Sequence, residues 1–529
     1  MERTSSADRS GKNSTIIPPD RELAVESDEI VTLDGEQMYR INRYDTMPAF
    51  LMSLVSDTDL WMYVSSYGPV TAGRVDEEHC LFPYVTDDQL HKAVGQTGPI
   101  TTLRVRRGSV NPQIWEPFQR FPAPEGIQRN LYKSLLSNRI TFEEINQNLG
   151  LTIRATWAPC DKFGFVRSVV VENNDRAVSA EVDIIDGLVN ILPAGIGLAM
   201  VQRFSCLVDA YTRCELDPET GVGVYALSSQ ITDRAEPAES LVANVLWSRG
   251  LPGARYLLGV DQAPGFLRGQ SFEEEKIVTG RRGAFLATAN VALEPGDRAS
   301  WDLVADVNRD QAQVEALRAF LGSERDPRAC LKEALTAGAD SLSRLVAMAD
   351  GRQATADTRA VWHHSACVLF NNMRGGVFAQ GYQLSRADFS DFVAAHNREV
   401  AGSEAAFLKK LPETISHADL IARAGASGSV DLLRLSREYL PLTFSRRHGD
   451  PSRPWNRFSI HVRNPDGTQV LDYAGNWRDI FQNWEALCVS YPEFLESVIA
   501  KFVNASTIDG FNPYRVMRDG IEWEEPRPD

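Results

Sequence analysis

Hydrophobic and polar positions alternate in short runs over the first half of the chain. Examples are "LTIRATW", from Leu151 to Trp157, and "AVSAEVDI", and β-branched residues are frequent in both. Turn residues such as Asp34-Gly35 and Pro295-Gly296 separate the runs. Many short strands joined by turns are typical of antiparallel sheets, so residues 28–305 are predicted to form a large β-sandwich.

Helical spacing replaces this alternation after about residue 309. The stretches "DQAQVEALRAFLGS" and "DPRACLKEALTAGADSLSRLVAMADG" are rich in Ala and Leu, and Asp326-Pro327 is a typical helix start. Residues 306–353 are therefore predicted to be a helical linker. Beyond it the spacing predicts helices at 356–372, 387–399, 402–412, 416–423, 430–438, 477–490 and 493–503.

The predicted helix 477–490 has an unusual polar face. Its apolar residues recur at helical spacing, whereas its polar residues include an arginine, a carboxylate and two carboxamides but no lysine: Arg478, Asp479, Gln482, Asn483 and Glu485. One interpretation is that Asn476 caps the helix and Asp479 completes a capping box. The other is that these side chains face a binding site. Both interpretations stay open on composition alone.

The binding interpretation assigns a role to each side chain. Arg478 and Asp479 would hold sugar hydroxyls, with Gln482 in support, because a carboxylate accepts and a guanidinium donates hydrogen bonds in fixed directions. Trp477 or Trp484 would supply an apolar platform for the C–H face of the sugar. These five residues are the predicted substrate-binding set.

An arginine-rich segment, "PLTFSRRHGDPSRPWNRF", interrupts the helical region from Pro441 to Phe458; we call it the arginine loop. Arg446, Arg447 and His448 are predicted to bind an anion such as phosphate, although basic runs are usually solvated. Upstream, Arg374 in "FNNMRGG" is either a rim residue of the same site or part of a helix end made by two glycines.

The segment from Ser65 to His91 is polar and rich in turn residues. It is expected to be a loop at an edge of the sandwich, either purely structural or reaching across to close a pocket on the next domain.

Charge and composition exclude several classes of function. A formal net charge of -16 argues against nucleic-acid binding, which needs a basic face. No apolar run is long enough for a membrane span, and residues 1–27 resemble a flexible tail without the apolar core of a signal peptide. Seven scattered cysteines without a CxxC pair favour reduced thiols, and the adjacent His363 and His364 cannot hold a metal together. We therefore expect a cytoplasmic protein that binds neither a metal nor a cofactor.

Two stretches of the chain resemble the inverting disaccharide phosphorylases, the glycoside hydrolase group typified by cellobiose and chitobiose phosphorylase. "RDIFQN", from Arg478 to Asn483, is similar to that family's Arg-Asp-x-x-Gln-Asp motif, and "GPVTAGRVDEEHCLFPYVTDDQLH" resembles an early family stretch. The resemblance implies a galactose-mutarotase-like sandwich, a helical linker, and a first half of an (α/α)6 barrel over 354–529. It also implies that Arg478 and Asp479 hold the sugar whose bond is broken.

The sequence departs from the family pattern at three places. Asn483 stands where the family tends to have Asp, and Asp472-Tyr473 occupies the place of a further sugar-binding arginine. The family's general acid lies far beyond the Arg-Asp pair, whereas Asp529 is 50 residues after Asp479. The general acid is thus expected beyond the end of this chain, and no catalytic residue is assigned within it.

Three functions remain open. The first is phosphorolysis of β-linked glucosides with inversion, with inorganic phosphate as co-substrate. The second is an inverting hydrolase on the same scaffold, for which Asp479 with Glu522 or Glu525 would supply the two carboxylates. The third is a non-catalytic carbohydrate-binding subunit. An oligosaccharide is the expected ligand, and the expected protein partner is either a second copy bound through the sandwich or a chain that completes the barrel.

Overall fold

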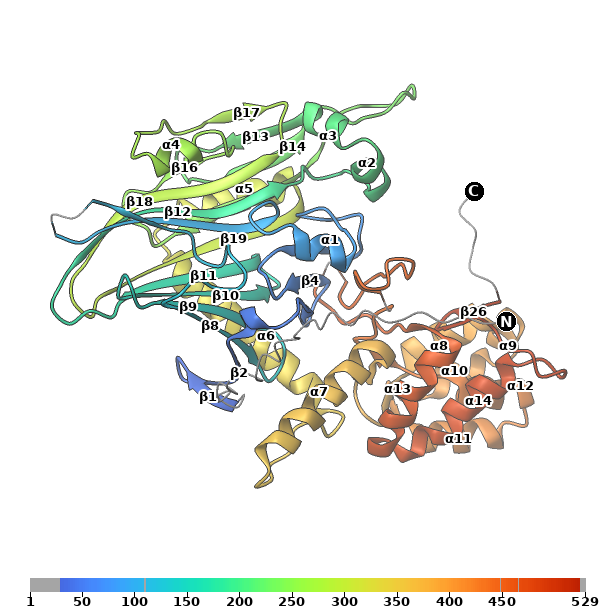
Figure 1. Ribbon diagram of the computed structural model, residues 1–529. Helices are drawn as coiled ribbons and strands as arrows, with labels where there is room; N and C mark the ends of the chain where they lie inside the picture. Colours follow the sequence, from blue (N-terminus) through green and yellow to red (C-terminus); the bar gives the residue numbers. More distant parts are fainter. Residues whose placement is uncertain (1–28, 109–110, 448, 465, 524–529) are drawn as a thin grey trace, which may run out of the picture.

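A computed structural model describes residues 29–108, 111–447, 449–464 and 466–523. The predicted tail 1–27 lies outside these residues. The remaining chain has a β-rich part followed by helices, and Figure 1 places the two parts side by side with a long helix running between them. The predicted order of an antiparallel β-sandwich, a helical linker and a helical region is confirmed.

Two antiparallel sheets form the sandwich within the described residues. The larger has 11 strands in the order β1 (Glu29–Leu33), β2 (Glu36–Asn42), β8 (Ile127–Ser134), β9 (Ile140–Asn146), β10 (Leu151–Cys160), β11 (Gly164–Asn173), β19 (Arg298–Asp310), β15 (Val242–Arg249), β14 (Gly223–Leu227), β13 (Thr212–Leu216) and β17 (Ile277–Thr279). The smaller has five, in the order β16 (Arg255–Leu257), β18 (Gly283–Leu293), β12 (Ala180–Ile191), β6 (Gly98–Arg106) and β7 (Gln113–Trp115).

Shorter elements surround the two sheets. A three-stranded sheet contains β3 (Leu51–Leu54), β4 (Leu60–Ser65) and β5 (Val70–Arg74). The short helices of this part are η1 (Tyr44–Thr46), α1 (Asp87–Lys92), α2 (Leu198–Arg203), α3 (Ser205–Tyr211) and α4 (Ala263–Leu267).

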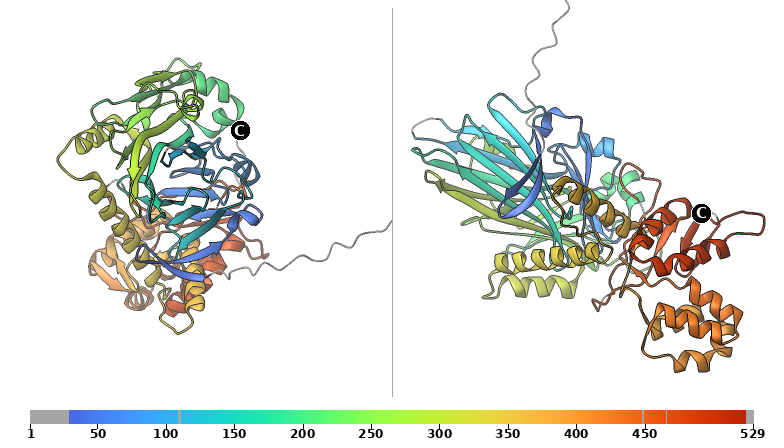
Figure 2. Two further views of the ribbon diagram at one scale, coloured as in Figure 1. Left: turned by 60° about the vertical axis from the view of Figure 1, so that its left-hand side comes forward. Right: turned by 90° about the horizontal axis from the view of Figure 1, so that it is seen from below.

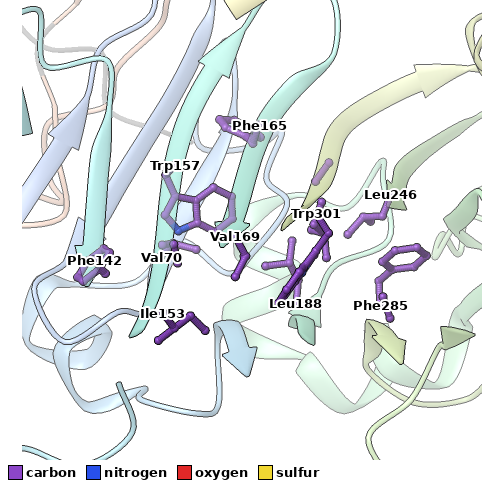
Figure 3. Packing of buried hydrophobic residues seen from close by; sticks show 14 of the residues in the cluster. Val70, Phe142, Ile153, Trp157, Phe165, Val169, Leu188, Leu246, Phe285 and Trp301 are labelled. Carbon is purple, nitrogen blue, oxygen red and sulfur yellow. The ribbon is translucent and has the colours of Figure 1, made fainter. Parts of the chain in front are cut away.

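The core of the sandwich lies between the sheets and is large and aromatic. Trp157 on β10 and Trp301 on β19 are fully buried in it, and Figure 3 shows both among aliphatic neighbours. A buried ion pair crosses the same layer: both carboxylate oxygens of Asp186 on β12 accept from Arg167 Nη1 on β11, at 2.8 and 2.7 Å. Trp301 Nε1 also donates to Asp186, at 2.7 Å. Apolar burial and this charged contact together fix how the two sheets face each other.

The linker consists of α5 (Gln311–Leu321) and α6 (Pro327–Ala347). Asp310 and Gln313 form a capping box at the start of α5, and the Asp326 carboxylate accepts from the Arg328 N–H at 2.9 Å to start α6, with Pro327 in the first turn. The two yellow helices lie along one side of the sandwich in the right-hand view of Figure 2.

A lobe of short helices follows α7 (Thr358–Gly375). It contains β21 (Gln383–Ser385), α8 (Arg386–His396), α9 (Arg398–Ser403), α10 (Ala405–Lys410), β22 (Thr414–Ser416), α11 (His417–Ala426) and α12 (Val430–Glu438). Strands β20 (Val377–Phe378) and β23 (Leu442–Thr443) pair antiparallel and bring the two ends of the lobe together. Figure 2 shows the lobe in orange, away from the sandwich.

The last elements return to α7. They are β24 (Ala474–Asn476), α13 (Trp477–Ser490), η2 (Pro492–Phe494), α14 (Leu495–Ala505), β25 (Arg515–Met517) and β26 (Gly520–Glu522). Helix α13 packs against α7, and β24, β25 and β26 form a small antiparallel sheet. Among the described residues, none of the helices combines the length and apolar character needed to cross a membrane.

Candidate functional site

Helices α7 and α13 approach each other closely at Gly375. A Cβ atom at this position would lie 2.8 Å from the Asn483 Cβ and 3.0 Å from Trp484 Cδ1. Trp484 Nε1 donates to the Gly375 carbonyl at 2.8 Å, and Asn483 Nδ2 donates to Asn371 Oδ1 at 2.8 Å. The first glycine of "RGG" therefore permits helix packing. The second, Gly376, ends α7 with a φ of 83°.

A pocket of about 110 Å³ lies where the C-terminal end of α7 meets the sandwich and the arginine loop. Its walls come from β3 and β4, from α7, and from residues 446–460. The residues that line it are Ser53, Leu54, Trp61, Met62, Tyr63, Phe370, Met373, Arg374, Arg446, Arg447, Gly449, Asp450, Phe458 and Ile460. Three arginines and one aspartate thus share a pocket whose remaining walls are mainly apolar and aromatic.

Arg446 is buried at the base of this region. Its Nη2 donates to the carbonyls of Ser56 and Thr58, the latter at 3.1 Å, and its guanidinium lies 4.9 Å from the centre of the Phe444 ring. Its Nε has no hydrogen-bond partner, and no ion pair with a carboxylate is found for it among the described residues. Burial lowers the pKa of Arg446 to about 10. A bound anion would offset this cost of burying a charge.

Arg374 connects this pocket electrostatically with the start of α13. Partial burial and the neighbouring charge of Arg453 lower the pKa of Arg374, while Asp450 and Asp479 act in the opposite direction. The contribution of Asp479 is the smallest of these effects. The arginine loop contacts the end of α7, where the Arg446 N–H donates to the Met373 carbonyl at 2.7 Å, and α7 in turn packs against α13, which carries the Arg-Asp motif.

The predicted substrate-binding residues do not all face this region. Arg478, Asp479 and Gln482 are exposed, and Gln482 Nε2 donates to the Arg478 carbonyl at 3.2 Å. Trp477 is half-buried and packs edge-on against Phe502, with ring centres 4.7 Å apart. The guanidinium of Arg478, the carboxylate of Asp479 and the carboxamide of Gln482 are thus available to a ligand at the exposed face of α13.

Two sequence interpretations need correction at α13. Trp484 is 1% exposed and its ring packs between Tyr473 and Phe502, so no ring face is open to serve as a sugar platform. The helix begins at Trp477 as predicted, but the Asn476 side chain makes no capping hydrogen bond. Instead Asn476 lies in β24, and the Trp477 N–H donates to the Tyr514 carbonyl at 2.9 Å.

Of the three predicted anion-binding residues, two line the pocket and one lies outside the described residues. Arg447 lines the pocket, and its N–H donates to the Ser459 carbonyl. Arg446 lines it from a buried position, whereas His448 lies outside the described residues. Of the carboxylates considered for hydrolysis, Glu525 also lies outside them, as does the side chain of Glu522.

The segment 65–91 and its neighbours reach across to the arginine loop. Arg457 pairs with Glu77 at 3.0 Å and with Glu78 at 2.9 Å, and the Asp87 N–H donates to the Pro451 carbonyl at 3.2 Å. Tyr63, which sequence reasoning did not single out, donates its hydroxyl to the Gly449 carbonyl at 2.7 Å. No local signal could reveal Tyr63, because its partner is 386 positions away.

A family model matches residues 378–441 of this chain: glycoside hydrolase family 149 insertion domain 1. The matched segment coincides with the lobe between β20 and β23. It covers α8 to α12, which lie within the stretch 354–529 predicted to be the first half of a barrel. No curated protein matches the chain.

The similarity of this chain to solved structures is low. A bacterial glucoamylase complexed with acarbose has 8% identity and a TM-score of 0.35, covering 78% of this chain and 58% of its own. A polysaccharide lyase has 13% identity and a TM-score of 0.29, covering 51% and 34%. A family GH92 α-mannosidase from Bacteroides thetaiotaomicron has 9% identity and a TM-score of 0.26, covering 77% and 47%. The chain spans less than two thirds of each of these structures.

Proposed function

We propose that this chain is part of a carbohydrate-active enzyme that cleaves β-linked glucosides by phosphorolysis with inversion. The observation that carries the proposal is the grouping of Arg374, Arg446 and Arg447 around one pocket at the end of α7, which packs against the helix that carries Asp479. This arrangement offers a cationic pocket for phosphate beside a carboxylate and a guanidinium for sugar. The match of residues 378–441 to a glycoside hydrolase insertion domain supports the same substrate class.

The residues of the site would share the work of the reaction. Arginine binds phosphate oxygens with charge-assisted hydrogen bonds, so Arg374 and Arg447 would hold the phosphate. Arg478 and Asp479 would hold the hydroxyls of the sugar and fix its orientation. A phosphate oxygen then bonds to the anomeric carbon while the glycosidic C–O bond breaks on the opposite face. The leaving oxygen takes a proton from the general acid, and an inverted sugar 1-phosphate results.

The general acid is proposed to lie outside this chain. A partner chain or further helices that complete the barrel would supply it, and apolar side chains on the surface of α13 and α14 support such a contact. Val489 is 83% exposed, Val503 64% and Ile499 53%, and apolar groups of this size are costly to leave in water. We also propose that two copies of the chain pair through the sandwich. A cytoplasmic location is a further proposal.

Binding measurements on the 529-residue chain test the site without requiring the general acid. Isothermal titration with inorganic phosphate should show binding that Arg374→Gln weakens about tenfold, since one charge-assisted contact contributes on the order of 1.4 kcal/mol. The matched control is Arg398→Gln at an exposed position of α9, which should leave the affinity unchanged. Equal phosphate affinities in all three proteins would refute the phosphate pocket.

A second titration, with β-linked gluco-oligosaccharides, tests the sugar contacts. Asp479→Asn should abolish binding, and retained binding would refute the role of Asp479. A mixture of the chain, a cell fraction that supplies the proposed general acid, phosphate and oligosaccharide then distinguishes the reactions, with phosphorus NMR for the sugar 1-phosphate and a reducing-sugar assay for free sugar. A new sugar 1-phosphate signal supports phosphorolysis, whereas free sugar released equally without phosphate indicates a hydrolase.

A further inference from the structure

A second pocket, of about 360 Å³, lies on the outer face of the sandwich beneath the linker helix α5. Strands β15 and β19 form its floor, and α5 and the turn after it form its roof. The residues that line it are Lys162, Phe163, Val245, Trp247, Asp306, Arg309, Gln313, Ala316, Leu317, Phe320 and Arg325. None of them belongs to the proposed sugar site, and the volume falls within the range of small-molecule pockets.

The apolar part of this pocket is aromatic. Phe163 packs edge-on against Trp247, with ring centres 6.0 Å apart, and lies 5.3 Å from the Phe320 ring. Phe163 and Trp247 are buried, whereas Phe320 and Leu317 on α5 are half-buried and keep apolar surface open. An aromatic ring placed here would gain both area burial and edge-to-face contacts.

The charged part of the pocket is positive. The Asp306 carboxylate already pairs with Arg74, Nε to Oδ1 at 2.7 Å, and with Arg309. Lys162 Nζ lies over the rings of Phe163 and Phe320, at 5.0 and 5.3 Å from their centres. No ion pair is found for Lys162 or Arg325 within the described ranges. Two cations therefore face an aromatic pocket in a chain whose net charge is -16.

Uncharged hydrogen-bonding groups are scarce in the pocket. Gln313 is the sole carboxamide among the lining residues, and its side chain accepts from the Asp310 N–H in the capping box of α5. The Asp306 carboxylate is already engaged by Arg74 and Arg309, so the lining offers few acceptors for the hydroxyl groups of a sugar. The combination of aromatic walls and unpaired cations instead suits a planar ring that carries an acidic group.

We propose that this pocket binds a small aromatic anion, with its ring against Phe320 and Leu317 and its carboxylate, sulfonate or phosphate paired with Lys162 and Arg325. Such a ligand would bridge the sandwich and α5. The site is independent of the proposed phosphorolysis.

Fluorescence titration of the full chain with 8-anilinonaphthalene-1-sulfonate, an aromatic sulfonate, tests the proposal. One saturable site is expected. Lys162→Gln and Arg325→Gln should each weaken it about five- to tenfold, and Ala316→Trp, which fills the pocket from the exposed side of α5, should remove it. Lys332→Gln, an equal charge change at an exposed position of α6, is the control and should not alter the affinity.

Circular dichroism and thermal melting confirm that each variant is folded before it is titrated. The proposal is overturned if Ala316→Trp retains full binding, because the dye then occupies another surface, such as the apolar residues of α14. It is also overturned if the three charge variants give equal affinities. Loss of binding only in the pocket variants supports it.

Discussion

The indole Nε1–H of Trp484 donates to the carbonyl of Gly375, and the same glycine leaves room for the indole ring. Gly375 thus supplies a hydrogen-bond acceptor where α7 packs against α13, and its lack of a side chain makes room for the indole ring. Arg374, at the end of α7, lines the pocket. The contact therefore fixes the position of Arg374 relative to α13, the helix that carries Arg478 and Asp479.

Replacing Gly375 with alanine tests the contact. The added methyl group would overlap Asn483 and Trp484, so Gly375→Ala should lower the free energy of unfolding by about 1–3 kcal/mol. Gly425→Ala on α11 is the control, because a Cβ atom there meets nothing within 4 Å, and it should be neutral or stabilising. Urea denaturation measures both. Equal effects of the two substitutions would contradict close packing at Gly375.

A second prediction concerns the buried ion pair between Arg167 and Asp186. Asp186→Asn keeps the shape of the side chain but leaves the buried Arg167 charge uncompensated, so the free energy of unfolding should fall by about 3–5 kcal/mol. Glu181 on the same strand pairs with Arg106 at the surface, and Glu181→Gln should cost less than about 1 kcal/mol. Chemical denaturation followed by tryptophan fluorescence gives both values. A loss for Asp186→Asn as small as that for Glu181→Gln would contradict the proposed importance of the pair.

Alanine substitution at the starts of α7 and α13 is expected to affect the free energy of unfolding differently. Asp357 accepts from the Ala360 N–H at the start of α7, so Asp357→Ala should lower the free energy of unfolding by about 1 kcal/mol. Asn476 makes no such bond at the start of α13, so Asn476→Ala should change it by less than about 0.5 kcal/mol. Thermal denaturation of both variants decides the matter. A comparable loss at Asn476 would restore the capping interpretation of α13.

Acid should weaken the contact between the lobe and α14. His417 at the start of α11 contacts Ser497 Oγ through Nε2 at 3.1 Å, and burial lowers the pKa of His417 to about 4, against a partial opposing effect of Glu496. The folded state therefore holds this histidine neutral, while the unfolded state binds a proton below about pH 6.5. The stabilisation is complete above that pH and is lost as pH falls towards 4.

Melting temperatures at about pH 7.5 and about pH 5 measure this effect. The native chain should lose more on acidification than His417→Gln does. The control is His363→Gln, which alters an exposed histidine on α7 and should keep the native pH dependence. An equal loss in the native chain and in His417→Gln would show that the burial of His417 does not couple to stability.

Local patterns predicted many of the elements but not all of their limits: in place of the predicted helices 387–399 and 402–412 the structure has three, α8, α9 and α10. Helix α13 spans the predicted 477–490, and α6 starts at the predicted Asp326-Pro327, because caps and apolar spacing are properties of neighbouring residues. Strands run from Glu29 to Asp310 over the region predicted as a sandwich, 28–305, and the bounds of that domain stay a prediction.

Contacts between distant segments could not be predicted in this way. The spacing that placed Trp484 on a helix could not tell whether it faces a ligand or the Gly375 backbone. Likewise, the helices of residues 386–438 have the same periodicity whether they belong to a barrel or to a separate lobe. The prediction that 354–529 is the first half of an (α/α)6 barrel stays a prediction. The pairing of β20 with β23, rather than any helical pattern, marks the limits of the lobe.

That pairing has an evolutionary consequence. Because Phe378 and Leu442 are partners in one short ladder, the intervening segment leaves and rejoins the main body at a single place. A longer, shorter or unrelated module whose ends meet there could replace it while Gly375 and Trp484 keep their contact. Exchange of the lobe at this position would also have to replace its contacts with Ser497 on α14 and with Arg518, which His417 and Asp388 now make.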